Sequence, residues 1–407
     1  MDGKTEGQTN RRAGRLAVFA CTFAYFISYF TRVDLAAVLV AVEETGFSAR
    51  SDAVLALALT SAAYGAGQMI SGWLSDRFDP RRVVACGFLL TASCNITAGI
   101  LGGSALPVLW ALNGLAQSMM WPPIVRILSA GFGKAEYTKA CIWVNGGGAA
   151  GIAAVYLSAP FIIKYIGIRA VFCIAGGAAV TGAAVWCLLS RRMQHAKRAD
   201  AECCGEQPAA APVGEKRALV FALVMCAILM QGALRDGITN WLPTYVSENF
   251  GIDSSSAVLS GAALPVCSVL AYLITQAVHK RFIKNELLCA NAVFGVCAAA
   301  SAVLRFAAGE SAVLSVICLA LAAGSMHGVN LILICIMPPY FARNGRVGLT
   351  AGIMNAGVYL GSAVATYCVP LVTGSYGKNG YLTLCLAAAL CGATACFAAA
   401  AKRRKLK

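Results

Sequence analysis

The run VVACGFLLTASCNITAGILG at residues 83–102 decides the fold class of this chain. It contains no charged side chain, and a helix of this length is about 30 Å long, which matches the hydrocarbon core of a bilayer. The polar stretch from Asp79 to Arg82 comes directly before it. Residues 83–102 therefore predict a transmembrane helix that begins at a membrane surface.

Similar apolar runs follow one another along the whole chain. Hydrophobic residues make up 59% of the 407 residues and charged residues only 13%, against about 25% in soluble domains. The fold class that we predict is an all-α membrane protein, with twelve transmembrane helices in two pseudo-symmetric six-helix bundles. The bundles are 1–190 and 217–407, joined by a polar linker at 191–216. The other predicted spans are 16–42, 52–74, 106–129, 139–162, 169–190, 217–245, 254–279, 286–304, 311–336, 348–372 and 380–401.

The basic residues are distributed unevenly between the two sides of the predicted membrane. Of the 33 Lys and Arg, 25 lie on the side of the N-terminus, five on the other side and three inside spans. Cytoplasmic loops are enriched in Lys and Arg, so we expect both termini to be cytoplasmic. The net charge of +15 does not indicate nucleic acid, because no basic stripe carries interleaved aromatic residues. No zinc-type spacing and no nucleophile–base pair is present, so we expect no enzymatic activity, metal or cofactor.

Two of the arginines inside spans are candidates for a binding site. Arg32 lies near the middle of the first span and Arg235 near the middle of the seventh. An arginine at the bilayer centre is costly, and its guanidinium binds phosphate or carboxylate oxygens bidentately. Two of them predict an anion clamp. The alternative is that each arginine pairs with a nearby carboxylate, Asp34 or Asp236.

Polar side chains at helical spacing accompany Arg32. Tyr25 and Tyr29 precede it on one face of the first span, and Tyr64 and Gln68 share a face of the second. We expect them to line a hydrated cavity, with ordinary hydrogen bonding between helices as the alternative.

The loop between the second and third spans carries another charged cluster. It runs from Gly72 through Asp76, Arg77 and Arg81. Asp76 and the arginines predict a charge lattice with neighbouring helix ends, and a simple positive-inside loop is the alternative. Arg126, near the cytoplasmic end of the fourth span, is predicted to be a gate or interface residue rather than a substrate ligand.

These motifs together resemble the major facilitator superfamily. The loop at 72–82 is similar to its signature loop. The segments Tyr29-Phe30-Thr31-Arg32, Ala63-Tyr64-Gly65, Leu112 to Gln117 with Trp121-Pro122-Pro123, and Leu234 to Ile238 with Trp241 to Tyr245 resemble one branch, the organophosphate:phosphate antiporters. His327-Gly328 and the segment from Gly352 to Gly361 resemble the tenth and eleventh spans of this branch more weakly.

The resemblance implies two bundles that rock around a central site, Arg32 and Arg235 as phosphate ligands, and inorganic phosphate as counter-substrate. It implies Tyr25, Tyr29 and Tyr64 as cavity lining, and adds Trp121 to the substrate-binding candidates. We expect a small anionic substrate and a monomer in a bacterial inner membrane.

The chain also departs from the branch. Gln68 stands where the bacterial glycerol-3-phosphate transporters have a lysine, and Asp34 and Asp236 are additional acids. Either acid would then bind an amino group of the substrate or carry a proton. A proton-coupled carrier of a carboxylate and a membrane sensor of a phosphorylated sugar therefore remain as alternatives.

Overall fold

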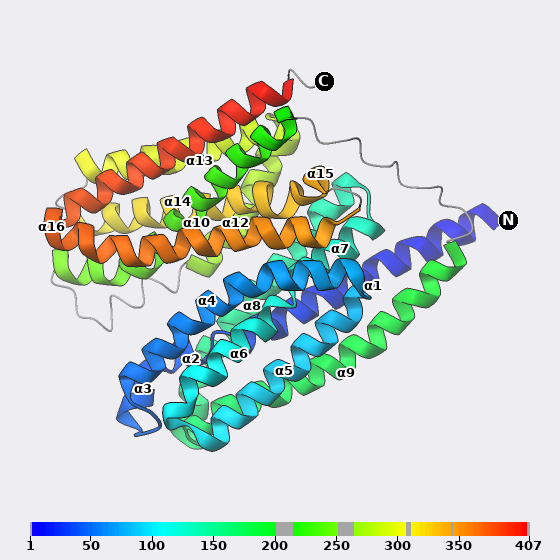
Figure 1. Ribbon diagram of the computed structural model, residues 1–407, viewed down its shortest axis with the longest axis horizontal. Coiled ribbons are helices and arrows are strands. Elements are labelled where there is room, and N and C mark those ends of the chain that lie inside the picture. Colours follow the sequence, from blue (N-terminus) through cyan, green and yellow to red (C-terminus); the bar gives the residue numbers. More distant parts are fainter. Residues whose placement is uncertain (1, 201–214, 251–263, 307–310, 343–344, 405–407) are drawn as a thin grey trace. The chain divides into compact units, whose positions relative to one another are not determined.

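The computed structural model describes residues 2–200, 215–250, 264–306, 311–342 and 345–404 (Figure 1). The described residues are almost entirely helical and contain no strand, which confirms the all-α prediction. The elements are α1 Asp2–Phe30, α2 Asp34–Ala37, α3 Leu39–Glu44, α4 Arg50–Arg77, α5 Pro80–Leu101, η1 Gly103–Ala105, α6 Leu106–Ser118, α7 Trp121–Gly131, α8 Lys134–Tyr165, α9 Ile168–Asp200, α10 Glu215–Phe250, α12 Leu264–Arg281, α13 Glu286–Phe306, α14 Ala312–Asn330, η2 Leu331–Ile336, α15 Pro338–Phe341 and α16 Val347–Arg404.

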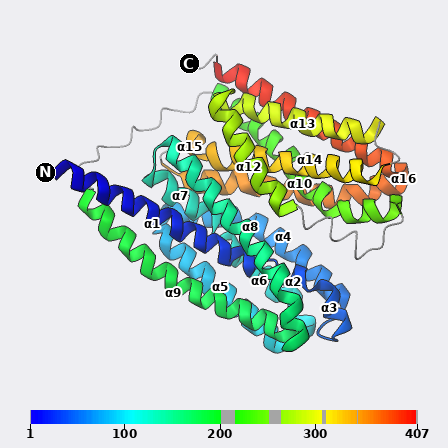
Figure 2. The ribbon, with the colours of Figure 1, turned by 180° about the vertical axis from the view of Figure 1, so that it is seen from behind.

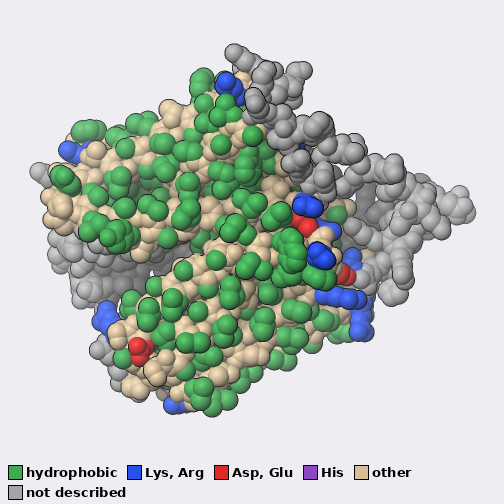
Figure 3. All heavy atoms as spheres, in the orientation of Figure 1, with side chains coloured by type: hydrophobic (Ala, Val, Ile, Leu, Met, Phe, Trp, Pro, Cys, Tyr) green, Lys and Arg blue, Asp and Glu red, His purple; other side chains and the backbone are tan. Residues whose placement is uncertain are grey.

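Many of these helices have the length and composition of membrane spans. Nine helices of the described ranges are long and apolar enough to cross a bilayer, and Gly14–Phe30 is a shorter apolar helix. Residues 254–263 of the predicted eighth span and 201–214 of the predicted linker lie outside the described residues. Figure 3 shows hydrophobic side chains spread over the visible face of the helices, as expected for surfaces that meet lipid.

Two predicted spans are interrupted rather than continuous. The predicted span 16–42 covers the second half of α1, then α2 and most of α3, because α1 ends at Phe30 and a turn follows. The predicted span 106–129 contains α6 and α7, which are separated at Met119 and Met120. Proline begins α7 at its first positions, where a missing backbone N–H costs least. The sequence pattern does not predict these breaks, because Arg32 and Asp34 are interpreted as site residues inside one span, and Met119 and Met120 lie in a mostly apolar run.

The last two predicted spans are joined in one long element. Helix α16 covers both, and Gly377 inside it has φ of +62°. That left-handed conformation favours glycine and interrupts the regular helix, so Gly377 separates the two predicted spans.

The chain forms two compact units. Unit 1 contains Met1–Ala210 with Ala342–Ile353, and unit 2 contains Ala211–Phe341 with Met354–Lys407. The first turns of α16 therefore belong to unit 1 and the rest of the helix to unit 2. Helix α9 continues to Asp200, inside the predicted linker. The predicted division at 190 and 217 stays a prediction.

Close helix contacts build unit 1. Helix α1 packs against α8 and α5 against α9, as Figure 2 shows from behind. A Cβ atom on Gly147 of α8 would lie 2.5 Å from the carbonyl oxygen of Thr22 on α1. Glycine therefore lets the two backbones approach, which fixes the position of α1 and of the residues that follow it.

Candidate functional site

Arg32 lies in the turn that ends the first helix. The Arg32 and Val33 N–H groups donate to the Tyr29 carbonyl, so the chain closes a tight turn after α1. The Arg32 guanidinium carbon lies 4.0 Å from the centre of the Tyr29 ring and 4.7 Å from that of Tyr64. Both distances are within the range of cation–π attraction, so α1 and α4 together hold the guanidinium.

The other aromatic candidates of unit 1 belong to the same cluster. The rings of Tyr25 and Tyr29 are 5.0 Å apart, and those of Tyr25 and Trp121 are 5.4 Å apart. Trp121 is buried, and its indole N–H has no hydrogen-bond partner among the described residues. An unsatisfied buried donor is costly, so this N–H is suited to bind a polar ligand atom or a water.

A buried polar network holds the backbone just before Arg32. The Thr31 carbonyl accepts from the side-chain amides of Asn95 and Asn113, each at 3.4 Å. The Gln117 amide donates to the Thr31 hydroxyl at 3.0 Å, and the Ser28 hydroxyl donates to Gln117 Oε1 at 2.6 Å. Sequence reasoning assigned none of these residues to the site. The available signal was their polarity within apolar helices and the four-residue spacing of Asn113 and Gln117.

The other two substrate-binding candidates of unit 1, Asp34 and Gln68, are fully buried. Asp34 has no exposed surface, and its Oδ1 accepts from the Leu35 N–H at 2.8 Å. Its Oδ2 has no hydrogen-bond partner in the described part of the chain. Gln68 is also completely buried on α4. The internal ion pair that was the alternative for Arg32 is therefore not formed by Asp34.

In unit 2 the predicted alternative, an internal ion pair between arginine and a nearby carboxylate, is formed. Arg235 Nε lies 2.6 Å and Nη2 2.8 Å from the two carboxylate oxygens of Asp236, which is a bidentate ion pair. The Arg235 guanidinium also lies 5.9 Å from the Tyr359 ring. The charge of Arg235 is thus compensated by its neighbour in sequence, and an anion bound there would meet a pair rather than an isolated cation.

Asp76 is placed at the start of α16. Its Oδ1 accepts from the Gly348 N–H at 3.0 Å and its Oδ2 from the Leu349 N–H at 2.7 Å. Arg126 Nη1 lies 3.5 Å from Oδ1. A Cβ atom on Gly72 would lie 2.5 Å from the Gly348 carbonyl oxygen, so only glycine allows this approach. Asp76 therefore caps the helix and balances its dipole.

The other two arginines of the loop have different surroundings. Arg77 is exposed, and its guanidinium lies 5.5 Å from the Trp73 ring. Arg81 stands in the first turn of α5, where its N–H donates to Asp79 and its carbonyl accepts from the Trp186 indole. The arginine found beside Asp76 is Arg126, which the sequence predicted as a gate or interface residue and not for the charge lattice. In the described ranges no group of His, Cys, Asp and Glu is arranged to hold a metal ion.

Comparisons with known proteins agree with this architecture. The chain is 28% identical over 251 residues to the Membrane sensor protein UhpC of Salmonella typhimurium, which covers 57% of each chain. The chain is 24% identical over 402 residues to the Glycerol-3-phosphate transporter of Bacillus subtilis, which covers 90% of this chain and 88% of the relative. The match to the sensor thus spans just over half of that protein's length.

A solved structure shows the same fold. The proton:xylose symporter XylE bound to 6-bromo-6-deoxy-D-glucose superposes with a TM-score of 0.72, over 95% of each chain at 12% identity. The model of the Major Facilitator Superfamily matches residues 18–366, which is most of the sequence. This chain is a multi-pass integral membrane protein that belongs to the Major Facilitator Superfamily.

Proposed function

We propose that the chain is a secondary active transporter of a phosphorylated organic anion, which it exchanges for inorganic phosphate by alternating access. The observation that carries the proposal is Arg32, whose guanidinium is held by two tyrosine rings next to an interrupted helix. Helices interrupted in the membrane are typical of transporter binding sites. The proposed substrate class comprises sugar phosphates, glycerol phosphate and phosphonates. The similarity to a Glycerol-3-phosphate transporter over most of the chain supports a phosphorylated substrate.

The residues take the following parts in this proposal. Arg32 and Arg235 bind the phosphate oxygens, and Asp236 sets the orientation and net charge of Arg235. The Trp121 indole donates to the substrate or to its hydration shell. Tyr25, Tyr29, Tyr64 and Gln68 line the cavity. Gly72, Asp76, Arg77, Arg81 and Arg126 form the gate.

The proposal extends to the setting of the protein. The chain functions as a monomer in a bacterial inner membrane, with both termini in the cytoplasm. The excess of Lys and Arg in the loops on the side of the termini supports this orientation.

Exchange of radiolabelled phosphate in proteoliposomes preloaded with phosphate tests the proposal. The wild type should exchange, and an excess of organophosphate outside should compete. Arg32→Ala should slow exchange about 100-fold, because a charge-assisted contact contributes about 3 kcal/mol. Arg32→Lys should recover only part of the loss, since an ammonium ion lacks the planar fork.

The matched control is Arg50→Ala, which removes an exposed arginine at the start of α4 and should exchange like the wild type. Absence of exchange in a well-folded wild-type preparation, or equal rates for Arg32→Ala and Arg50→Ala, would refute the proposal.

A proton-coupled carrier is the second candidate, and Asp34 favours it. An ionised carboxylate without a paired cation is expensive to bury, so Asp34 is the place where a carried proton would reside. Uptake driven by an imposed pH gradient without internal phosphate, abolished by Asp34→Asn, would establish this mechanism. Inhibition by carboxylates and not by phosphate analogues would identify a carboxylate substrate.

The third candidate is a membrane sensor, because a relative of the chain is a Membrane sensor protein. A sensor should bind hexose phosphate tightly but exchange phosphate slowly. Measuring binding and exchange on the same preparation separates the two functions.

A further inference from the structure

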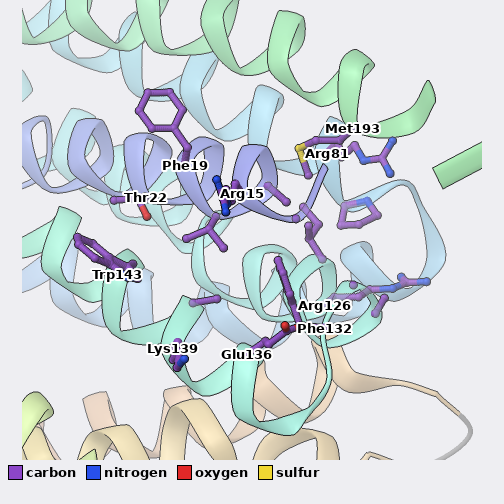
Figure 4. A pocket seen from close by; sticks show the side chains of 18 of the residues that line it. Arg15, Phe19, Thr22, Arg81, Arg126, Phe132, Glu136, Lys139, Trp143 and Met193 are labelled. Atoms are coloured by element: carbon purple, nitrogen blue, oxygen red, sulfur yellow. The ribbon is translucent and has the colours of Figure 1, made fainter. Parts of the chain in front are cut away.

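A large pocket lies within unit 1, apart from Arg32. Its volume is about 1020 Å³, and its walls come from α1, α5, α7 and α8, with Met193 of α9 (Figure 4). The last residue of α1 that lines the pocket is Thr22, and the eight residues from there to the end of α1 at Phe30 correspond to about 12 Å of helix. The pocket lining does not include Arg32 or the aromatic residues around it.

The pocket lining is rich in basic residues. Arg15, Arg81, Arg126 and Lys139 line the pocket, against two carboxylates, those of Asp79 and Glu136. Figure 4 shows Arg81 and Arg126 on the same side of the pocket. Glu136 lies in the first turn of α8. Asp79 caps α5, and its Oδ1 accepts a hydrogen bond from the Arg81 N–H at 2.9 Å. The excess of cations predicts an anionic occupant.

Arg81 strengthens this prediction. Its Nε and Nη1 atoms are buried, and they have no hydrogen-bond partner within the described residues. Nη1 of Arg126 is buried as well and makes no hydrogen bond there, although it lies 3.5 Å from Asp76. Buried guanidinium donors without acceptors are costly, and phosphate oxygens match their fork geometry.

The end of the pocket opposite Arg81 and Arg126 is apolar. Phe19 lies one helical turn beyond Arg15 on α1, and Trp143 lies one turn beyond Lys139 on α8. Both aromatic residues therefore lie deeper in the membrane than the two cations, as measured from the membrane surface on the side of the N-terminus. Both side chains are largely exposed, at 60% and 67%. Figure 4 shows Phe19 and Trp143 at the end opposite Arg81 and Arg126. The pocket thus changes from cationic to apolar along the membrane normal, over about 6 Å.

We propose that this pocket binds an anionic phospholipid of the leaflet on the side of the N-terminus. The headgroup phosphate contacts Arg81, Arg15 and Lys139, and an acyl chain lies along Phe19 and Trp143. A soluble phosphate would use the basic end alone and would gain nothing from the apolar end. The lipid gains from both, because basic residues attract anionic headgroups and burying each methylene is favourable.

Native mass spectrometry of the full-length protein, equilibrated with phosphatidylglycerol or phosphatidylcholine, tests this site. The wild type should retain one phosphatidylglycerol in preference to phosphatidylcholine. The double variant Arg15→Gln/Lys139→Gln should bind it roughly 30-fold more weakly, since each cation near a membrane surface contributes about fivefold. The matched control, Lys280→Gln/Arg281→Gln, removes the same charge from exposed positions of unit 2 and should retain the lipid. Equal retention by the double variant and the control would overturn the proposal.

A second pair of measurements separates lipid from soluble anion and guards against misfolding. Trp143→Ala should weaken phosphatidylglycerol retention while leaving the basic end intact. Inorganic phosphate, added to an Arg32→Ala protein, should not displace the lipid. Displacement by phosphate, or retention unaffected by Trp143→Ala, would show that the occupant is a soluble anion and would overturn the lipid assignment. These results do not depend on transport, so they stand apart from the test of the proposed function.

Discussion

Replacing Asp76 by alanine should release the first turn of α16. The carboxylate accepts two backbone N–H groups, those of Gly348 and Leu349, and lies 3.5 Å from Arg126. Loss of a helix cap costs about 1 kcal/mol, and loss of the charge at the helix N-terminus about another 1 kcal/mol. The sum of about 2 kcal/mol corresponds to a roughly 30-fold increase in local opening.

Amide hydrogen exchange measured by mass spectrometry is the suitable assay, since it reports the opening of short segments. Peptides that cover 345–355 should exchange roughly 30-fold faster in Asp76→Ala. Asp76→Asn should show a smaller effect, because the amide keeps one acceptor oxygen but loses the charge. The control is Asp79→Ala, which removes the cap of α5 and should leave α16 unchanged.

Unchanged exchange in 345–355 for Asp76→Ala would refute the assignment of Asp76 as the cap of α16. Faster exchange throughout the chain would show general destabilisation instead. The expected result is confined to the start of α16.

Three further changes test other contacts. Gln117→Leu should lower the free energy of unfolding by about 1–3 kcal/mol, because the Ser28 and Thr31 hydroxyls lose their hydrogen bonds to the buried Gln117 amide. Thermal unfolding in detergent measures the change in stability. An unchanged unfolding midpoint would contradict the prediction. Gly72→Val should destabilise the contact with α16 by about 1–3 kcal/mol, since the valine side chain would meet the Gly348 carbonyl. Faster amide hydrogen exchange in peptides of 345–355 is the expected result. Exchange there at the wild-type rate would contradict the close approach of the two backbones. Asp236→Asn should tighten phosphate binding several-fold in calorimetry, because Arg235 loses a competing anion, and weaker binding would mean that the carboxylate mainly positions the guanidinium.

Much of the fold followed from patterns that are local in sequence. Uncharged runs of about 20 residues predicted the spans, and arginines inside such runs predicted where polar groups gather. The spacing of Tyr25 and Tyr29 placed them on one face, and the structure brings both to the Arg32 cluster. Helical periodicity explains this success, because it relates residues three or four positions apart.

The contacts that cross the fold were harder to predict. Asp76 and Gly348 are 272 residues apart, and no local pattern connects them. The pairing of Arg235 with Asp236 depended on side-chain rotamers, and adjacency in sequence left it open. The interruption at Met119 falls inside an apolar run, where hydropathy carries no signal. The interruption after Phe30 coincides with the charged residues Arg32 and Asp34, which were interpreted as site residues and not as a helix end.

The Thr31 carbonyl has a consequence for mutational studies. It is a main-chain atom that receives the amides of Asn95 and Asn113, so no substitution at position 31 removes the acceptor. A saturation scan would therefore record this interaction at positions 95 and 113, while position 31 would report only its hydroxyl. The two asparagines should also be epistatic, since either one alone still gives the carbonyl a donor. The residue at the centre of the network would look tolerant, and its importance would be seen only in the double mutant of its neighbours.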